Sequence, residues 1–283
     1  MNKKLESQIS IIKPQRSLWD VNFREIWQYR DLIILFVQRD FVAIYKQTIL
    51  GPLWFLIQPL LTTVMYTIVF ANIAKISTSN VPPILFYMSG TVAWTYFSTS
   101  LIKTSDTFIN NAAIFGKVYF PRMVVPLSVI ISNMIQFFIQ LCLFIGILLF
   151  YVLKGIHFEL GPNLFLIPVL LIILAGLGLG FGIIISSLTT KYRDLKQLVA
   201  FGVQLWMYAT PVIFPLTEIN GKYRIFFLLN PLTGIIESFR TVLLGVGELN
   251  YLYLGYSTGF MIILLTAGIL LFNRIERNFM DYV

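Results

Sequence analysis

The sequence predicts an all-α membrane protein with six transmembrane helices, and three observations support this prediction. Six long windows carry no charged side chain, the segments between them hold the charge, and the composition is strongly apolar. Of the 283 residues, 57% are hydrophobic and 12% are charged, and the mean hydropathy is +0.80. A soluble domain would carry about twice that share of charged residues.

The six windows are each long enough to cross a bilayer, because ~30 Å of hydrocarbon takes about 20 helical residues. A charge at the bilayer centre costs ~2.5 to 3.5 kcal/mol, whereas a Leu or Ile returns only about 0.3 to 0.6, so an uncharged window of this length is a strong signal. The windows are residues 47–74, 76–102, 123–153, 160–190, 197–217 and 249–273.

The chain before the first window divides into two parts. Residues 1–17 have mixed charge and are expected to form a disordered arm, whereas residues 18–46 show the spacing of an amphipathic helix. We expect this helix to lie in the membrane interface, followed by the transmembrane domain at 47–283. It could serve only as an anchor, or its Arg residues could contact a substrate. Its apolar stripe consists of Phe23, Ile26, Trp27, Ile33, Ile34, Val37, Phe41 and Ile44.

Residues 103–122, the coupling segment, connect the second and third windows. This stretch has room for one short helix that begins after Ser105 or Asp106 and ends near Gly116. Its apolar side chains favour docking onto another surface. In the fourth window, the small residues Gly176, Gly178, Gly180 and Gly182 predict close packing against neighbouring helices.

Residues 215–250, before the last window, form the longest connection on the other side of the membrane. Two short apolar helical stretches, 223–229 and 232–244, are separated by Asn230-Pro231. Neither can cross alone, so we expect a re-entrant hairpin that acts as an external gate. Glu237 and Arg240 are three residues apart and can pair on one helix face.

The distribution of positive charge predicts that both termini are cytoplasmic. All but five of the 21 Lys and Arg residues fall on the same side as the termini; the exceptions are Lys75, Lys154, Lys222, Arg224 and Arg240. Anionic membrane lipid accounts for the net charge of +8, so no nucleic acid partner is expected. The polar first 46 residues show no cleavable signal sequence.

The windows contain no group for catalysis or ion coupling, since Asp, Glu, Lys, Arg and His are absent from all six. The single His157 and the single Cys142 cannot build a metal site or a disulfide. A phosphate-binding loop is also absent, because Gly116-Lys117 is followed by Val118 and Gly221-Lys222 by Tyr223. We therefore expect no cofactor in this chain, and any use of ATP must come from another subunit.

Aromatic side chains inside the windows are candidates to line a path for sugars, because their faces stack on sugar rings while phenol and indole groups donate hydrogen bonds. The alternative is an aromatic belt at the membrane interface, which we favour for Phe70, Phe86, Tyr87 and Phe214. The candidate lining residues are Tyr66, Phe70, Trp94, Tyr96, Phe97, Trp206 and Tyr208. Arg39 and Lys46, just before the first window, are cations that can pair with a phosphate group, such as the diphosphate of a lipid-linked substrate that the resemblance below implies, or serve only to orient the chain.

Several motifs, in this order, resemble the transmembrane subunit of bacterial ABC exporters for O-antigen and teichoic acid polysaccharides. The resemblance runs from about residue 20 to the end, although this chain has Thr210 and Phe214 where the family commonly has Ser and Tyr. The matching stretches are Arg39-Asp40, residues 45–54 (YKQTILGPLW), residues 58–61 (QPLL), residues 117–122 (KVYFPR), residues 192–194 (YRD), residues 210–215 (TPVIFP) and residues 229–234 (LNPLTG) with Glu237, Phe239 and Arg240.

This resemblance implies a homodimer in the bacterial inner membrane, bound to two cytoplasmic ATPase subunits that bind ATP and Mg²⁺, and exporting an undecaprenyl-diphosphate-linked polysaccharide. O-antigen is the first candidate, and teichoic acid or capsule is the alternative. It also implies that Asn230, Pro231, Glu237 and Arg240 belong to an external gate. The residues implied to contact the ATPase are Asn110, Asn111, Phe115, Lys117, Tyr119 and Phe120. Rival functions are a membrane enzyme acting on lipid-linked sugars and an ATP-independent carrier.

Overall fold

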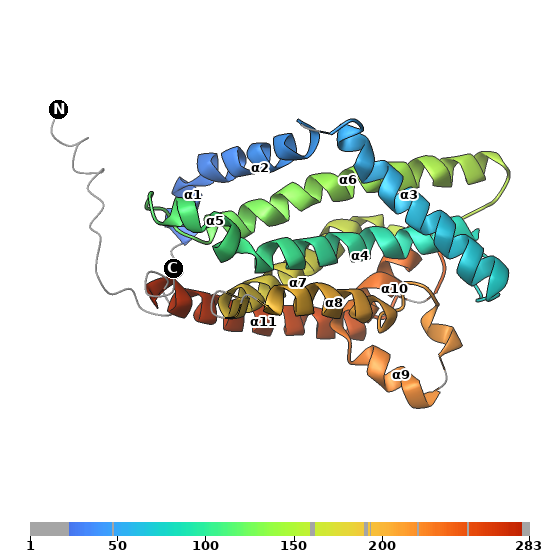
Figure 1. Cartoon of the computed structure of the whole chain (residues 1–283). Coiled ribbons are helices and arrows are strands. Elements are labelled where there is room, and N and C mark those ends of the chain that lie inside the picture. The colour runs from blue at the N-terminus through green and yellow to red at the C-terminus, as the bar shows by residue number, and fades with distance from the viewer. Residues whose placement is uncertain are drawn as a thin grey trace.

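The computed structural model describes residues 23–46, 48–158, 162–189, 192, 194–219, 221–247 and 249–278, and these residues form helices and loops without a strand. The predicted arm at 1–17 lies outside the described residues. The long helices run side by side along one axis (Figure 1). The α-helices are α1 (Phe23–Gln28), α2 (Arg30–Tyr45), α3 (Trp54–Tyr66), α4 (Pro83–Ser105), α5 (Thr107–Phe115), α6 (Val124–Leu153), α7 (Leu166–Thr189), α8 (Leu195–Tyr208), α9 (Gly221–Leu228), α10 (Pro231–Leu244) and α11 (Tyr251–Asn278).

Four continuous helical stretches in the described part of the chain are long and apolar enough to cross a membrane: Gly51–Ile73, Val124–Leu153, Asn163–Thr189 and Tyr251–Arg274. The first stretch comprises α3 and the short helical segments on either side of it. Pro59 lies inside α3, and the helix continues past it. The bent pair α9 and α10 could form a fifth crossing. Six transmembrane helices are therefore more than these criteria support.

The second expected span, α4, has 23 residues but is less apolar than the four stretches. It lies in the centre of the bundle, and α7 and α6 are the helices it contacts most. A helix enclosed by protein can carry hydroxyl groups if they are satisfied locally. Ser89 and Thr91 are buried, and each hydroxyl donates to a carbonyl one turn earlier, of Phe86 and Met88.

The fifth expected span, 197–217, is wrong as a single helix. α8 ends at Tyr208 after 14 residues, about 21 Å of rise, which is short of the ~30 Å hydrocarbon layer. Pro211 disfavours a helical conformation at Thr210. The side chains of Asn230 and Arg240 then bind the carbonyls of the turn that follows, so the chain folds back into the protein instead of continuing outward.

α7 packs between α4 and α11. Its glycines face the two neighbours alternately: a Cβ on Gly178 or Gly182 would meet Ser100 or Thr104 of α4, and a Cβ on Gly176 or Gly180 would meet Met261 or Leu264 of α11. For Gly182, the nearest atom would be the Thr104 Cβ at 2.4 Å. The predicted close packing is thus confirmed, and it fixes α4 against α7 and α11.

The N-terminal helices α1 and α2 cover the beginning of α6, at the end of the bundle where α5 and the end of α11 lie (Figure 1). Of the helix predicted at 18–46, residues 18–22 lie outside the described residues, and the described part forms α1 and α2. The buried side of α2 centres on Phe36, whereas Ile34 and Leu35 are exposed. Ile34 and Trp27 were both assigned to the apolar stripe, but both are exposed. The covered side of α2 is the side of Phe36, which packs against Phe120 and α6. Interfacial placement of this helix stays a prediction.

Candidate functional site

The coupling segment folds into α5 between Asp106 and Gly116, as the sequence predicts. Phe108, Phe115 and Phe120 bury their rings in one cluster with Phe36 of α2 and Phe272 of α11. The rings of Phe108 and Phe272 stack with centroids 4.7 Å apart, and those of Phe36 and Phe120 lie 5.9 Å apart. The segment therefore packs against α2, the beginning of α6 and the end of α11.

The residues expected to contact an ATPase separate into two groups. Asn111 is buried and donates a hydrogen bond to the Thr107 carbonyl at 3.0 Å, and Phe115 and Phe120 belong to the buried cluster. Asn110, Lys117 and Tyr119 are exposed. Only the second group can meet a partner without rearrangement, so the exposed surface of this segment comprises Asn110, Ala113, Gly116, Lys117, Val118 and Tyr119.

Asp106, at the corner between α4 and α5, does not cap α5 with its side chain. Its carboxylate Oδ2 lies 2.7 Å from Nζ of Lys196 in the first turn of α8, and only 9% of the Asp106 side chain is exposed. Next to this pair, the Thr189 hydroxyl donates to the Ser105 carbonyl at 2.9 Å. Sequence patterns did not predict this ion pair, because its members lie far apart along the chain.

The two candidates for admitting a lipid diphosphate lie in the described part of the chain near the end of α2. The guanidinium of Arg39 pairs with Asp40 at 2.8 Å and lies over the Phe36 ring at 4.7 Å, whereas Lys46 is exposed. A third cation, Lys103 at the end of α4, was not anticipated there. Its Nζ donates to Oδ1 of Asn133 in α6 at 3.0 Å.

The aromatic candidates gather in two groups inside the bundle. Trp94, Phe97 and Trp206 pack with Phe181 of α7, and the Phe97 and Trp206 ring centroids lie 5.4 Å apart. Tyr66 and Phe70 form the second group with Tyr87, and the Tyr66 hydroxyl donates to Sδ of Met207 at 3.5 Å. These contacts join α3, α4, α7 and α8.

The exposure of these rings differs. Tyr96 and Phe97 are enclosed in the core of the chain, and the Tyr96 ring packs against Phe137. Trp94 is nearly as buried, whereas Tyr66, Phe70 and Trp206 are half-buried and Tyr208 is exposed. The less buried residues are thus available to a path along the surface of one chain. Whether any of the seven lines such a path stays a prediction.

The assignment of Phe86 and Tyr87 to an interface belt is wrong. Both are fully buried, because α10 folds over this part of α4. The Phe86 ring lies 3.9 Å from the guanidinium carbon of Arg240. These side chains are therefore part of the packing that holds the external hairpin.

The external hairpin, residues 215–250, consists of α9 and α10, which meet at an angle of 98° at Asn230-Pro231. Asn230 caps α10 by accepting from the Leu232 amide, and its Nδ2 donates to the Ala209 carbonyl at 2.9 Å and the Thr210 hydroxyl at 2.8 Å. The sequence correctly placed both helices and the break. It did not indicate that α10 is buried while α9 is not.

Arg240 and Glu237 form the expected pair, with Nη1 to Oε1 at 2.8 Å, although the Arg240 side chain is only 1% exposed. Nη2 of Arg240 also donates to the carbonyls of Pro211 and Val212, at 2.9 and 3.3 Å, and the Leu216 amide donates to Glu237 at 3.2 Å. A buried cation is tolerated only with such partners. The pair therefore fixes α10 to the outer turn, residues 209–219, that follows α8.

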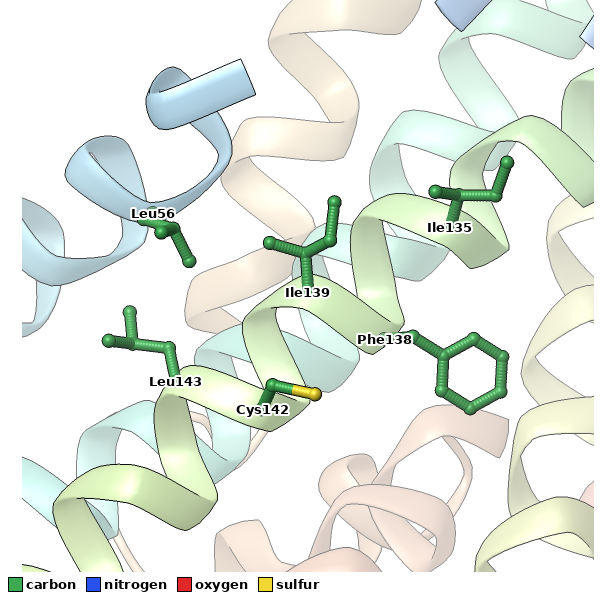
Figure 2. A pocket seen from close by; sticks show the side chains of 6 residues that line it. All are labelled: Leu56, Ile135, Phe138, Ile139, Cys142 and Leu143. Carbon is green, nitrogen blue, oxygen red and sulfur yellow. The ribbon is translucent and has the colours of Figure 1, made fainter. Parts of the chain in front are cut away.

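Two of the hollows on the described surface lie near candidate residues or the helices that carry them. One, of about 580 Å³, lies between α3 and α6, and Figure 2 shows Leu56 opposite Ile139 and Leu143, with Cys142 beside them. The side chains that line this hollow are apolar, so they can make contacts only with hydrocarbon groups. The other, of about 440 Å³, lies on the outer side between residues 74–77 and the outer turn, and includes Lys75, Phe214 and Glu218. Within the described residues, no group of three His, Cys, Asp or Glu could hold a metal ion.

Comparison with known proteins gives one family and several relatives. The family model described as ABC-2 type transporter matches residues 31–244. An O-antigen export system permease protein RfbA of Klebsiella pneumoniae is 32% identical over 253 residues, which cover 89% of this chain and 94% of the relative. A protein of the same name from Myxococcus xanthus is 30% identical over 224 residues, covering 77% of this chain and 82% of the relative.

Proposed function

Because the chain belongs to the ABC-2 type transporter family, we propose that it is the membrane subunit of an ATP-driven exporter of lipid-linked polysaccharide, with O-antigen as the substrate. One observation carries this proposal: similarity to O-antigen export permeases extends over 89% of the chain, and so includes both the coupling segment and the external hairpin. The glycan is carried on undecaprenyl diphosphate in the bacterial inner membrane.

ATP and Mg²⁺ belong to a partner in this proposal. The sequence has no Gly-rich loop ending in Gly-Lys-Ser or Gly-Lys-Thr, so hydrolysis needs a cytoplasmic ATPase subunit, one for each membrane subunit. The exposed part of the coupling segment, with Asn110, Lys117 and Tyr119, is a suitable docking surface. The end of the bundle that holds this surface also holds the beginning of α1 and the end of α11, in agreement with two cytoplasmic termini (Figure 1).

A homodimer is supported by the polar surface of α8. Gln197, Phe201, Gln204 and Tyr208 are all exposed and follow one helix face at steps of three or four residues. An amide without a hydrogen-bond partner in hydrocarbon costs roughly 4 to 8 kcal/mol. This face should therefore meet a second copy or a hydrated glycan rather than lipid. A path between two copies, with amides and aromatic rings along it, satisfies both conditions.

Co-purification tests the proposal. A tagged chain expressed with the ATPase subunit encoded beside it should yield a complex of two copies of each, and deletion of the chain should leave the lipid-linked glycan inside the cell. Processing of lipid-linked sugar by the purified chain alone would contradict the proposal and favour an enzyme. Restoration of teichoic acid or capsule export, but not O-antigen export, in deletion strains would reassign the substrate.

A further inference from the structure

Lateral contacts of α8 are made mainly by Val203 and, near Tyr208, by Trp206 and Met207, and polar contacts lie at both of its ends. Of its 14 residues, Val203 is the one that is buried, whereas Leu198, Phe201 and Leu205 are more than half exposed. A short helix with little lateral packing can shift along its axis without breaking a core. Its terminal contacts therefore determine what it moves with.

The inner end of α8 is bound to the coupling segment. Lys196 pairs with the nearly buried Asp106 at 2.7 Å, at the corner where α4 ends and α5 begins. The second carboxylate oxygen of Asp106 is buried and accepts no hydrogen bond from the described residues. Among the described residues, Lys196 is the cation that pairs with this carboxylate, so a displacement of the corner should carry α8 with it.

The outer end of α8 is bound to the external hairpin. The chain leaves Tyr208 directly into the outer turn, whose carbonyls at Ala209 and Pro211 accept from Asn230 and Arg240. Both donors belong to α10 or to its cap. The inner surface and the hairpin are consequently joined by one helix with a polar attachment at each end.

We infer that the Asp106–Lys196 ion pair is the positioning link that transmits movement of the coupling segment through α8 to the external hairpin. This inference rests on the proposed function, because an ATPase must supply the movement. α4 also joins the two regions, but it packs more closely against α7 than α8 does, since Gly178 and Gly182 leave little room for a Cβ against Ser100 and Thr104. α8 packs less extensively, mainly through Val203, Trp206 and Met207.

A reporter cysteine can test the link in the complex with the ATPase subunit, reconstituted in lipid vesicles. The chain carries Cys142→Ala and Thr217→Cys, since Thr217 is exposed in the outer turn. A membrane-impermeant maleimide then measures access to residue 217 with and without ATP. We expect the ATP-dependent change in labelling rate to fall roughly fivefold or more in Asp106→Asn and in Lys196→Gln, the usual size of coupling between two sites.

Two variants keep the test specific. Lys196→Arg retains the charge and should respond to ATP like the unaltered chain, whereas Asp31→Asn removes an exposed carboxylate beside Arg30 and should also leave the response unchanged. ATP hydrolysis should persist in all variants. The link is refuted if Asp106→Asn and Lys196→Gln respond normally, or if the reporter chain with only Cys142→Ala and Thr217→Cys shows no ATP-dependent change in labelling. Failure of the ATPase subunit to bind at all would instead refute the proposed function.

Discussion

Arg240 is the fully buried cation of the external hairpin, and its guanidinium contacts Glu237, two backbone carbonyls and the Phe86 ring. Removing one member of a buried pair leaves the other uncompensated, at a cost of roughly 3 kcal/mol or more. We expect Arg240→Met to lower the free energy of unfolding by about this amount, measured by denaturant unfolding in detergent.

Two comparisons support or contradict this expectation. Glu237→Leu combined with Arg240→Met should regain part of the loss, because no unpaired carboxylate then remains. Arg224→Met, at an exposed position of α9, should have little effect. If Arg240→Met unfolds at the same denaturant concentration as the unaltered chain, the pair does not hold the hairpin.

Substitution of Arg39 and Lys46 tests whether these two cations bind the diphosphate of the substrate. A charge-assisted hydrogen bond contributes about 1.5 to 3 kcal/mol, so losing both cations should reduce export roughly tenfold or more if they bind the diphosphate. The measurement is glycan export by Arg39→Ala with Lys46→Ala, at matched levels of assembled complex. Arg30→Ala, an exposed arginine at the start of α2, is the control. Export equal to that of the control would leave Arg39 and Lys46 with only a role in orientation.

At the scale of elements, the contact of α7 with α4 depends on the absence of side chains. A Cβ on Gly182 would lie 2.4 Å from Cβ of Thr104 and 3.2 Å from the Leu101 carbonyl oxygen, both rigid neighbours. We expect Gly182→Leu to cost about 1 to 3 kcal/mol of stability, the typical effect of overpacking. Gly146→Leu is the matched control, because nothing lies within 4 Å of a Cβ there. Equal melting temperatures for both variants would show that α7 and α4 can separate freely.

In the coupling segment, substitution of an exposed residue should affect docking of the ATPase, whereas substitution of a buried residue should affect stability. Lys117 is exposed, so Lys117→Glu should weaken ATPase-dependent export while the stability of the isolated chain stays unchanged. Phe115 is 6% exposed within the phenylalanine cluster, so Phe115→Ala should cost about 3 to 5 kcal/mol of stability. Export assays and unfolding curves of both variants check this division. Normal export by the Lys117→Glu variant would remove this residue from the docking surface.

The same elements show how far the sequence allows prediction. Uncharged windows identified the positions of α4, α6, α7 and α11, because insertion into a bilayer depends on a local sum of side-chain costs. The end of α8 at Tyr208 could not be predicted in this way. It depends on Asn230 and Arg240, which reach the outer turn only after the chain has folded back.

In the candidate site, too, features that depend on local spacing were predicted, and features that depend on distant helices were not. The break at Asn230-Pro231, the pairing of Glu237 with Arg240 and the glycine contacts followed from local spacing. The Asp106–Lys196 pair and the burial of Phe86 and Tyr87 did not, because each depends on helices that are distant in the sequence. Interactions across the bundle are what the sequence pattern leaves undetermined.

At the scale of the whole molecule, the chain combines an exposed coupling segment at one end of the bundle, a central packed bundle and the hairpin of α9 and α10 at the other end, and its sequence has no nucleotide-binding motif (Figure 1). Such a chain can guide a substrate but cannot by itself supply the energy for uphill transport. It follows that transport belongs to an assembly of several subunits.

The most direct test of this account is glycan movement in proteoliposomes. Vesicles containing the chain with its ATPase subunit should move undecaprenyl-diphosphate-linked glycan across the bilayer when ATP and Mg²⁺ are supplied on the side of the coupling segment. Vesicles containing the chain alone, or ATP on the opposite side, should move none. Directional movement by the chain alone would contradict the account.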